Sequence, residues 1–175
     1  MARSASAPQA VDLSGEWLAS GRDGLVIGEG AAAIVIESLE HAQRRSANIL
    51  GEIVGFGMSA DAGDLLAPDA GGMLRAINGA LTDGGLAASD VQYVNAHGTG
   101  TAANDETETE ALKRVFGAHA GKLVMSANKS MIGHALGAAG ALEMVATLMT
   151  VKDGVVPPTI NYLGPDPACD IDCVP

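Results

Sequence analysis

The sequence predicts one α/β domain, and three observations support this fold class. Short apolar stretches rich in β-branched residues alternate with longer segments in which apolar residues recur at helical spacing. The chain has 175 residues, of which 47% are hydrophobic and 18% are charged, so it can bury a sizeable core. Aromatic residues make up only 3% and glycines number 23, which indicates an aliphatic and closely packed interior.

The domain is expected to begin near residue 21, because residues 1–20 show no clear period and suggest a poorly ordered lead-in. From residue 21 to residue 175, strands and helices alternate. Strands are expected at residues 25–27, 31–36, 49–58, 91–95 and 122–126. Helices are expected at residues 37–46, at 71–84, from Asn104 or Asp105 to Gly117, and at 136–152. The last helix is Ala-rich and apolar nearly all round, so it should be buried between layers.

The charge balance argues against two classes of partner. There are 21 acidic and 10 basic residues, and the resulting net charge of −11 would repel both nucleic acid and an anionic membrane surface. The most apolar stretch, residues 135–151, is interrupted by Gly137, Gly140 and Glu143, so it predicts a buried helix and no membrane span. With no secretory signal pattern and only 2 cysteines, a cytoplasmic protein is expected.

Three weaker patterns are interpreted as structural. Residues 28–33 match the dinucleotide-binding fingerprint, but the β-branched residues 34–36 follow where that motif requires a helix, which favours a turn over a nucleotide site. Cys169 and Cys173 lie in a loop and not at a strand-to-helix turn, so neither is expected to be a nucleophile. The 4 histidines are too dispersed for a zinc site, and no metal is expected.

Two segments, residues 94–101 and 128–134, point to a catalytic site. Each places a histidine beside small residues directly after a predicted strand, and sites in α/β folds lie at strand ends. His97 and His134 are therefore candidate catalytic residues. Lys129 stands between them in sequence and could hold a nearby carboxylate. The candidates for that carboxylate are Asp105, Glu108 and Glu143.

At these two segments the chain resembles a β-ketoacyl-acyl carrier protein synthase, an elongating condensing enzyme of the thiolase-fold superfamily. Residues 95–101 (Asn-Ala-His-Gly-Thr-Gly-Thr) resemble the loop that holds the first active-site histidine of that family. Residues 129–134 (Lys-Ser-Met-Ile-Gly-His) resemble the loop with the active-site lysine and the second histidine. The intervals of 32 residues from His97 to Lys129 and of 37 residues from His97 to His134 also agree. Further matches follow in the same order at residues 22–30, 138–141 and 157–161.

The resemblance covers roughly residues 21–175 and implies the C-terminal half of such an enzyme. The expected fold is thiolase-like and layered, with a mixed sheet and a buried Ala-rich helix. The family's nucleophilic cysteine lies in the N-terminal half, and nothing in this chain matches its turn. The resemblance therefore predicts an incomplete domain, from a truncated or split gene or an excised fragment, that associates or aggregates in isolation.

The activity that the resemblance implies is decarboxylative Claisen condensation of malonyl-acyl carrier protein with an acyl thioester, in fatty-acid, polyketide or nodulation-type lipid synthesis. His97 and His134, both neutral, would donate hydrogen bonds to the enolate oxygen that forms when CO2 leaves. Lys129 would orient His97 and bind Asp105 or Glu108.

The resemblance also implies how the substrate is delivered. Thr99 and Thr101 would hydrogen-bond the phosphopantetheine arm of the carrier protein, and Glu143 would be a buried structural carboxylate beneath the site. No cofactor of the chain's own is expected, because phosphopantetheine arrives on the acyl carrier protein. The second partner would be another copy in a homodimer or a complementing synthase half.

Three functions remain open from the sequence. The chain could descend from a condensing acyltransferase and be unable to complete the reaction alone. It could be a non-catalytic partner that stabilises another synthase or measures chain length. It could also be a complementing half enzyme, completed by a separate chain with the nucleophilic cysteine. The complete set of His97, Lys129 and His134 argues against the non-catalytic partner, which would not need it.

Overall fold

The computed structural model describes residues 21–22, 24–64 and 66–175, and the expected lead-in at residues 1–20 lies outside them. Its helices and strands are α2 (Leu39–Arg44), α3 (Ala70–Asp83), β1 (Tyr93–Asn95), α4 (Ala102–Phe116), β2 (Val124–Ser126), α5 (Lys129–Ile132) and α6 (Ala139–Asp153). Short 3-10 turns lie at Ala88–Asp90, Gly117–Lys122 and Leu136–Ala138. In the described ranges, no helix combines the length and the apolar character that a membrane span requires.

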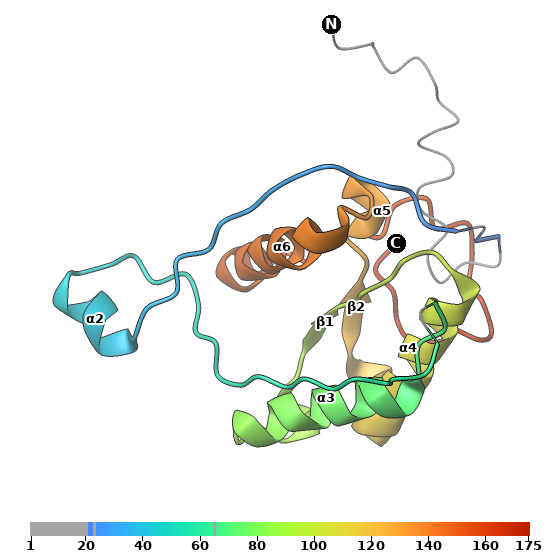
Figure 1. The fold of residues 1–175 in the computed structure, drawn as a ribbon, viewed down its shortest axis with the longest axis horizontal. Coiled ribbons are helices and arrows are strands. Elements are labelled where there is room, and N and C mark those ends of the chain that lie inside the picture. Colours follow the sequence, from blue (N-terminus) through green and yellow to red (C-terminus); the bar gives the residue numbers. More distant parts are fainter. Residues whose placement is uncertain (1–20, 23, 65) are drawn as a thin grey trace, which may run out of the picture.

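A small parallel sheet separates two layers of helices. β1 and β2 pair in parallel, with Tyr93 opposite Val124. Figure 1 shows α6 on one side of this sheet and α3 and α4 on the other. Asn95 at the end of β1 donates its side-chain amide to Glu143 O (3.1 Å) and to Thr147 Oγ1 (2.9 Å), which ties β1 to α6. This layering confirms the predicted α/β class.

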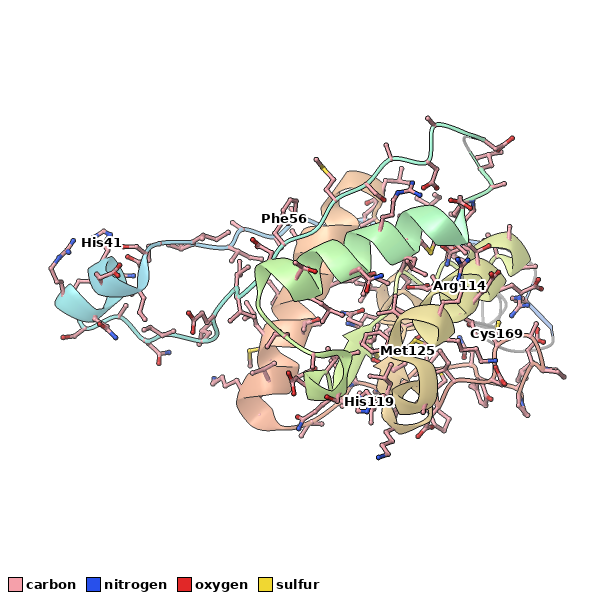
Figure 2. The ribbon with its side chains drawn as sticks, turned by 90° about the horizontal axis from the view of Figure 1, so that it is seen from below. His41, Phe56, Arg114, His119, Met125 and Cys169 are labelled. Carbon is pink, nitrogen blue, oxygen red and sulfur yellow. The ribbon has the colours of Figure 1, made fainter. Side chains whose placement is uncertain are left out.

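The core lies between α4, β2 and the C-terminal segment. Leu112 and Phe116 on one face of α4 pack in a buried cluster with Met125 of β2, and the cluster also contains Cys169 and Ile171. Met125 and Cys169, which are labelled in Figure 2, are only 1% and 3% exposed. The C-terminal segment is held to β2 by backbone hydrogen bonds, so it completes the core at this edge of the sheet.

Local sequence signals set the ends of the longer helices. The Asp69 carboxylate accepts from Gly72 N (2.8 Å) and caps α3, as a short polar side chain at this position does in many helices. α4 begins one turn earlier than predicted, because Thr101 and neither Asn104 nor Asp105 is its N-cap. Thr101 Oγ1 accepts from Asn104 N at 3.3 Å.

Two of the predicted strands are wrong for the described part of the chain. Residues 31–36 and 49–58 are extended but pair with no neighbouring strand, and residues 25–27 contribute only a single bridge from Ile27 to His134. A strand needs a hydrogen-bonded neighbour, so apolar patterning alone does not create one. The described sheet therefore has two parallel strands and is not mixed. Residues 49–58 pack instead on α3, where a Cβ on Gly57 would lie 2.0 Å from Ala76 O.

The Ala-rich helix α6 is only partly buried, in contrast to the prediction. Ala139 and Thr150 are buried, whereas Val145, Met149 and Val151 are exposed by 40%, 39% and 68%. The sheet covers one face of the helix. Residues 30 and 51 approach it from another side, where a Cβ on each glycine would lie 2.9 Å from Leu142 and 2.8 Å from Leu148.

Candidate active site

The His97 loop is held by a carboxylate on the following helix. Glu108 of α4 accepts hydrogen bonds from the backbone N–H groups of His97 (2.7 Å) and Gly98 (3.0 Å). Asn104, one turn earlier on α4, donates its side-chain amide to Glu108 Oε2 at 3.3 Å. Burial of Glu108 raises the pKa of its carboxyl, and the two backbone hydrogen bonds oppose this rise. Glu108 thus fixes the main chain at His97 by accepting two N–H groups.

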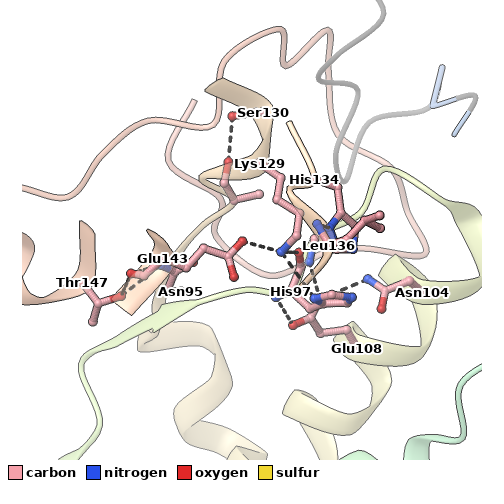
Figure 3. Close-up of polar contacts among 12 residues, drawn as sticks. Asn95, His97, Asn104, Glu108, Lys129, Ser130, His134, Leu136, Glu143 and Thr147 are labelled. Atoms are coloured by element: carbon pink, nitrogen blue, oxygen red, sulfur yellow. Dashed lines mark hydrogen bonds and ion pairs between the residues drawn. The ribbon is translucent and has the colours of Figure 1, made fainter. Parts of the chain in front are cut away.

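Lys129 reaches His97 from the end of the neighbouring strand. Lys129 is the first residue of α5 and follows the end of β2 by three residues. Its side chain is 5% exposed. Nζ lies 3.3 Å from His97 Nδ1 and 2.5 Å from His97 O, and it forms an ion pair with Glu143 of α6 (Figure 3). The parallel strands therefore bring Lys129 and His97 together, as the strand-end argument predicts.

The carboxylate partner of Lys129 differs from the one that the resemblance implied. It is Glu143, and neither Asp105 nor Glu108. Glu108 is occupied by backbone N–H groups, and Asp105 is fully buried in α4 beside the side-chain amide of Asn104. Glu143 is therefore an ion-pair partner within the site as well as a structural carboxylate.

His134 approaches His97 from the loop after α5. The ring centroids of the two histidines are 5.4 Å apart and their planes stand at 88°, an edge-to-face arrangement. His134 Nδ1 accepts a hydrogen bond from the backbone N–H of Leu136 at 3.0 Å (Figure 3). Gly133, with φ of 71°, supplies the turn that aims His134 back toward His97.

Both imidazoles are held in the neutral form. Desolvation, with the charge of Lys129 next and then His134, lowers the pKa of His97 to about 4, although one side of the residue remains exposed. The pKa of His134 is lowered as well, by desolvation and by Lys129. In each ring Nδ1 faces a group that can only donate, the Lys129 ammonium or the Leu136 N–H, so the proton belongs on Nε2. The site therefore offers two neutral Nε2–H donors.

The two threonines of the first loop interact with each other. Thr99 Oγ1 and Thr101 Oγ1 are 2.8 Å apart, and Thr101 also caps α4. Both residues are half-buried. They lie within the loop that carries His97, and their predicted contact with phosphopantetheine stays a prediction.

An apolar cavity of about 510 Å³ opens behind the first loop. It is bounded by α3, α4 and β1, and its polar lining includes Asn95, His97 and Glu108. Sequence reasoning missed Asn95 and Asn104 as parts of the site. The four-residue spacing of Asn104 and Glu108 on one helix is the signal that could have identified the Asn104 contact.

The cysteines and the glycine fingerprint make packing contacts in the described part of the chain. Cys169 and Cys173 are buried free thiols, and burial raises the pKa of both, that of Cys173 to about 11. Gly28 donates its N–H to His134 O (3.0 Å), and a Cβ there would lie 2.2 Å from Ile132 O. This glycine permits close backbone packing, and within residues 24–38, which the structure describes, no helix follows it to receive a phosphate.

Known proteins with the same features fall in one family. The sequence pattern of the β-ketoacyl synthase C-terminal domain matches residues 50–163. Nodulation protein E from Rhizobium sp. (strain N33) is 56% identical over 156 residues, which are 89% of this chain and 39% of that protein. The 3-oxoacyl-[acyl-carrier-protein] synthase 2 of Coxiella burnetii is 53% identical over 157 residues, 89% of this chain and 38% of that protein.

Solved structures that resemble this chain are ketosynthases as well. The ishigamide ketosynthase/chain length factor matches with a TM-score of 0.88 and 42% identity, over 92% of this chain and 40% of that chain. AntDE:AntF, a type II PKS acyl-carrier protein in complex with its ketosynthase, matches with a TM-score of 0.88 and 38% identity, over 97% and 42%. The thiolase-like layered fold is thereby confirmed, and the chain spans about two-fifths of the length of these relatives. The chain belongs to the β-ketoacyl synthase family and carries the C-terminal domain of that family.

Proposed function

We propose that this chain supplies the enolate-stabilising half of a 3-oxoacyl-acyl carrier protein synthase. The reaction is decarboxylative Claisen condensation: malonyl thioester loses CO2, and the resulting enolate attacks an acyl group carried as a thioester on cysteine. The observation that carries the proposal is the pair of neutral imidazoles, His97 and His134, each with its Nδ1 occupied and its Nε2–H free to donate. Two such donors suit an oxygen on which negative charge develops as the carbon–carbon bond to CO2 breaks.

Each residue of the site has a distinct role in this step. His97 and His134 donate to the thioester oxygen of the malonyl group. Lys129 holds the tautomer and orientation of His97 through Nδ1, and Glu143 holds Lys129 in place by an ion pair. Removal of one donor to such an oxyanion costs about 3 kcal/mol, or about 10²-fold in rate.

The acyl-enzyme nucleophile must come from outside these 175 residues. Cys169 and Cys173 are both buried, and the raised pKa of each thiol disfavours the thiolate that attacks a thioester. A complementing synthase half that carries the nucleophilic cysteine is the source that we propose.

Acyl carrier protein is the proposed partner that delivers the substrates. The AntDE ketosynthase, which resembles this chain, is in complex with an acyl-carrier protein. Thr99 and Thr101, beside His97, would contact the phosphopantetheine arm as it enters. The relatives named 3-oxoacyl-[acyl-carrier-protein] synthase 2 support acyl thioesters as the substrate class.

A non-catalytic partner subunit is the alternative function. The ishigamide ketosynthase/chain length factor shares this fold, and this similarity is the reason to consider such a role. The intact contacts of Lys129 with His97 and Glu143 favour the catalytic role, because a subunit that only supports another synthase does not require them.

The test is release of CO2 from malonyl-acyl carrier protein by the purified chain, alone and mixed with a synthase half that carries the nucleophilic cysteine. We expect His97→Ala and His134→Ala each to reduce release by about 10²-fold. His41→Ala is the control, because His41 is exposed on α2, away from the site (Figure 2). Release that persists at the wild-type rate in His97→Ala contradicts the proposal. No release from folded protein under either condition favours the non-catalytic partner.

A further inference from the structure

The segment at residues 24–28 touches both histidine loops. At its start, Gly24 lies against the first loop, since a Cβ on Gly100 would be 2.8 Å from Gly24 O. At its end it forms a parallel bridge with the second loop, where His134 N donates to Val26 O (2.7 Å) and Gly28 N donates to His134 O (3.0 Å). We call residues 24–28 the strap. The strap therefore spans the two loops whose side chains face each other at the site.

A buried arginine, Arg22, precedes the strap by two positions in the sequence and anchors this end of it. The Arg22 side chain is 5% exposed, and its guanidinium contacts three groups. Nη2 lies 3.0 Å from Glu106 Oε1 and 2.8 Å from Asp166 Oδ2, and Nη1 donates to Cys169 Sγ at 3.1 Å. Figure 1 shows the blue start of the described chain beside the red C-terminal loop that carries two of these partners. A buried cation needs such compensation, so these contacts specify where residue 22 sits.

The partners of Arg22 belong to the framework of the first loop. Glu106 lies in α4, two turns or less from Thr101, which caps that helix and ends the His97 loop. Asp166 and Cys169 lie in the C-terminal loop, and Cys169 is part of the buried core. Arg22 thus connects one end of the strap to α4 and to the core. The other end of the strap is hydrogen-bonded to the main chain of His134.

We infer that Arg22 is a positioning residue, which sets the separation of His97 and His134 by anchoring the strap that joins their loops. The catalytic role of this positioning rests on the proposed function. The distance between the His97 and His134 rings is a property of the fold and can be measured without turnover. Loss of the anchor frees the strap at the first loop while its bonds to His134 persist, so the second loop loses this tie to the first and is held only by β1–β2 pairing and by Lys129. A guanidinium serves this purpose better than an ammonium, because its planar fork reaches several partners at once.

The experiment follows the two imidazoles by NMR in the whole chain, because this readout requires no turnover. We expect Arg22→Met to abolish the nuclear Overhauser effect between the His97 and His134 rings, and Arg22→Lys to weaken it. Arg114→Met is the matched control: Arg114 is 52% exposed in α4, and its loss removes the same charge and an ion pair with Glu110. The control should leave the ring contact at its wild-type strength.

A folded Arg22→Met variant with an unchanged ring contact overturns the inference. If that variant does not fold, Arg22→Lys decides: a weakened contact supports the inference and a wild-type contact refutes it. Where the wild-type sample releases CO2, Arg22→Met should reduce release by about 10²-fold with the His97 tautomer unchanged, as misplacement by about 1 Å does in other enzymes. If the wild type releases no CO2, that result contradicts only the proposed function. The NMR measurement still tests the role of Arg22 in placing the two rings.

Discussion

Replacement of Lys129 by methionine removes the ammonium that faces His97 Nδ1 at 3.3 Å, and it should change both the charge state and the tautomer of that ring. Methionine keeps the length and much of the volume of the lysine stem, so packing changes little. Without the ammonium, protonation of His97 is less opposed, and the pKa of His97 should rise. The proton is also no longer confined to Nε2, so the fraction of His97 able to donate to an enolate should fall.

The size of the pKa change follows from the geometry. With the dielectric constant of water, about 80, two charges 3.3 Å apart interact by about 1.3 kcal/mol, or about one pKa unit, and this is the lower limit of the effect. The pKa of His97 in the folded chain sets the upper limit. The pKa of His97 is lowered from 6.5 to about 4, and desolvation is the largest cause, so Lys129 accounts for less than half of that difference. Methionine at position 129 should therefore raise the pKa of His97 from about 4 to about 5.

The assay is an NMR titration of the imidazole carbon-bound protons, with His97→Ala to assign the signal. Methionine at position 129 also leaves Glu143 without its partner, and that uncompensated carboxylate would raise the pKa of His97 further. The double variant Lys129→Met with Glu143→Gln removes this contribution and isolates the effect of the ammonium. A pKa of His97 that stays near 4 in the folded double variant would refute the reasoning, because the charge of Lys129 would then play no part in keeping the ring neutral.

Three further outcomes are expected. Because His97 has a pKa of 6.5 when unfolded and about 4 when folded, its contribution to stability is complete above pH 6.5 and is lost as the pH falls toward 4; urea unfolding should show a shallower pH dependence in His97→Ala over this window. Gly28→Ala should cost about 1–3 kcal/mol, since its Cβ would lie 2.2 Å from Ile132 O, whereas Gly137→Ala meets nothing within 4 Å and should be nearly neutral in the same unfolding assay. Leu112→Ala, at a residue that is 3% exposed, should cost about 2–5 kcal/mol in denaturant; a cost below 1 kcal/mol would contradict the core described for α4.

The sequence predicts those elements whose signals are local. The helix at Ala70–Asp83 follows from the Asp69 cap and its apolar spacing, and β1 and β2 from short β-branched stretches that run into the motif loops. Residues 31–36 carry an equally strong strand pattern and yet form none in the described part of the chain, because pairing depends on a neighbour that the pattern cannot specify. Strand character is thus foreseeable from sequence, and strand pairing is not.

The candidate site could also be predicted only in part. His97, Lys129 and His134 could be identified from loop composition and spacing, and the structure brings all three together. The choice of Glu143 among three carboxylates could not be made, because it depends on how α6 docks against β1. The tautomer of His134 could not be predicted either, because it depends on a hydrogen bond from the backbone N–H of Leu136. A backbone contact of this kind leaves no pattern in the sequence.

Helix α6 connects the open surface of this chain to its chemistry. Glu143 lies on the face of α6 that the sheet covers, where it holds Lys129, whereas Val145 and Met149 lie on the opposite face and are exposed. Exposed apolar faces of this kind mark interaction surfaces in folded proteins. A shift of α6 relative to the sheet would change the distance between Glu143 and Lys129. The ion pair that orients His97 therefore depends on how firmly α6 is held against β1, where Asn95 donates to Glu143 O and to Thr147 Oγ1.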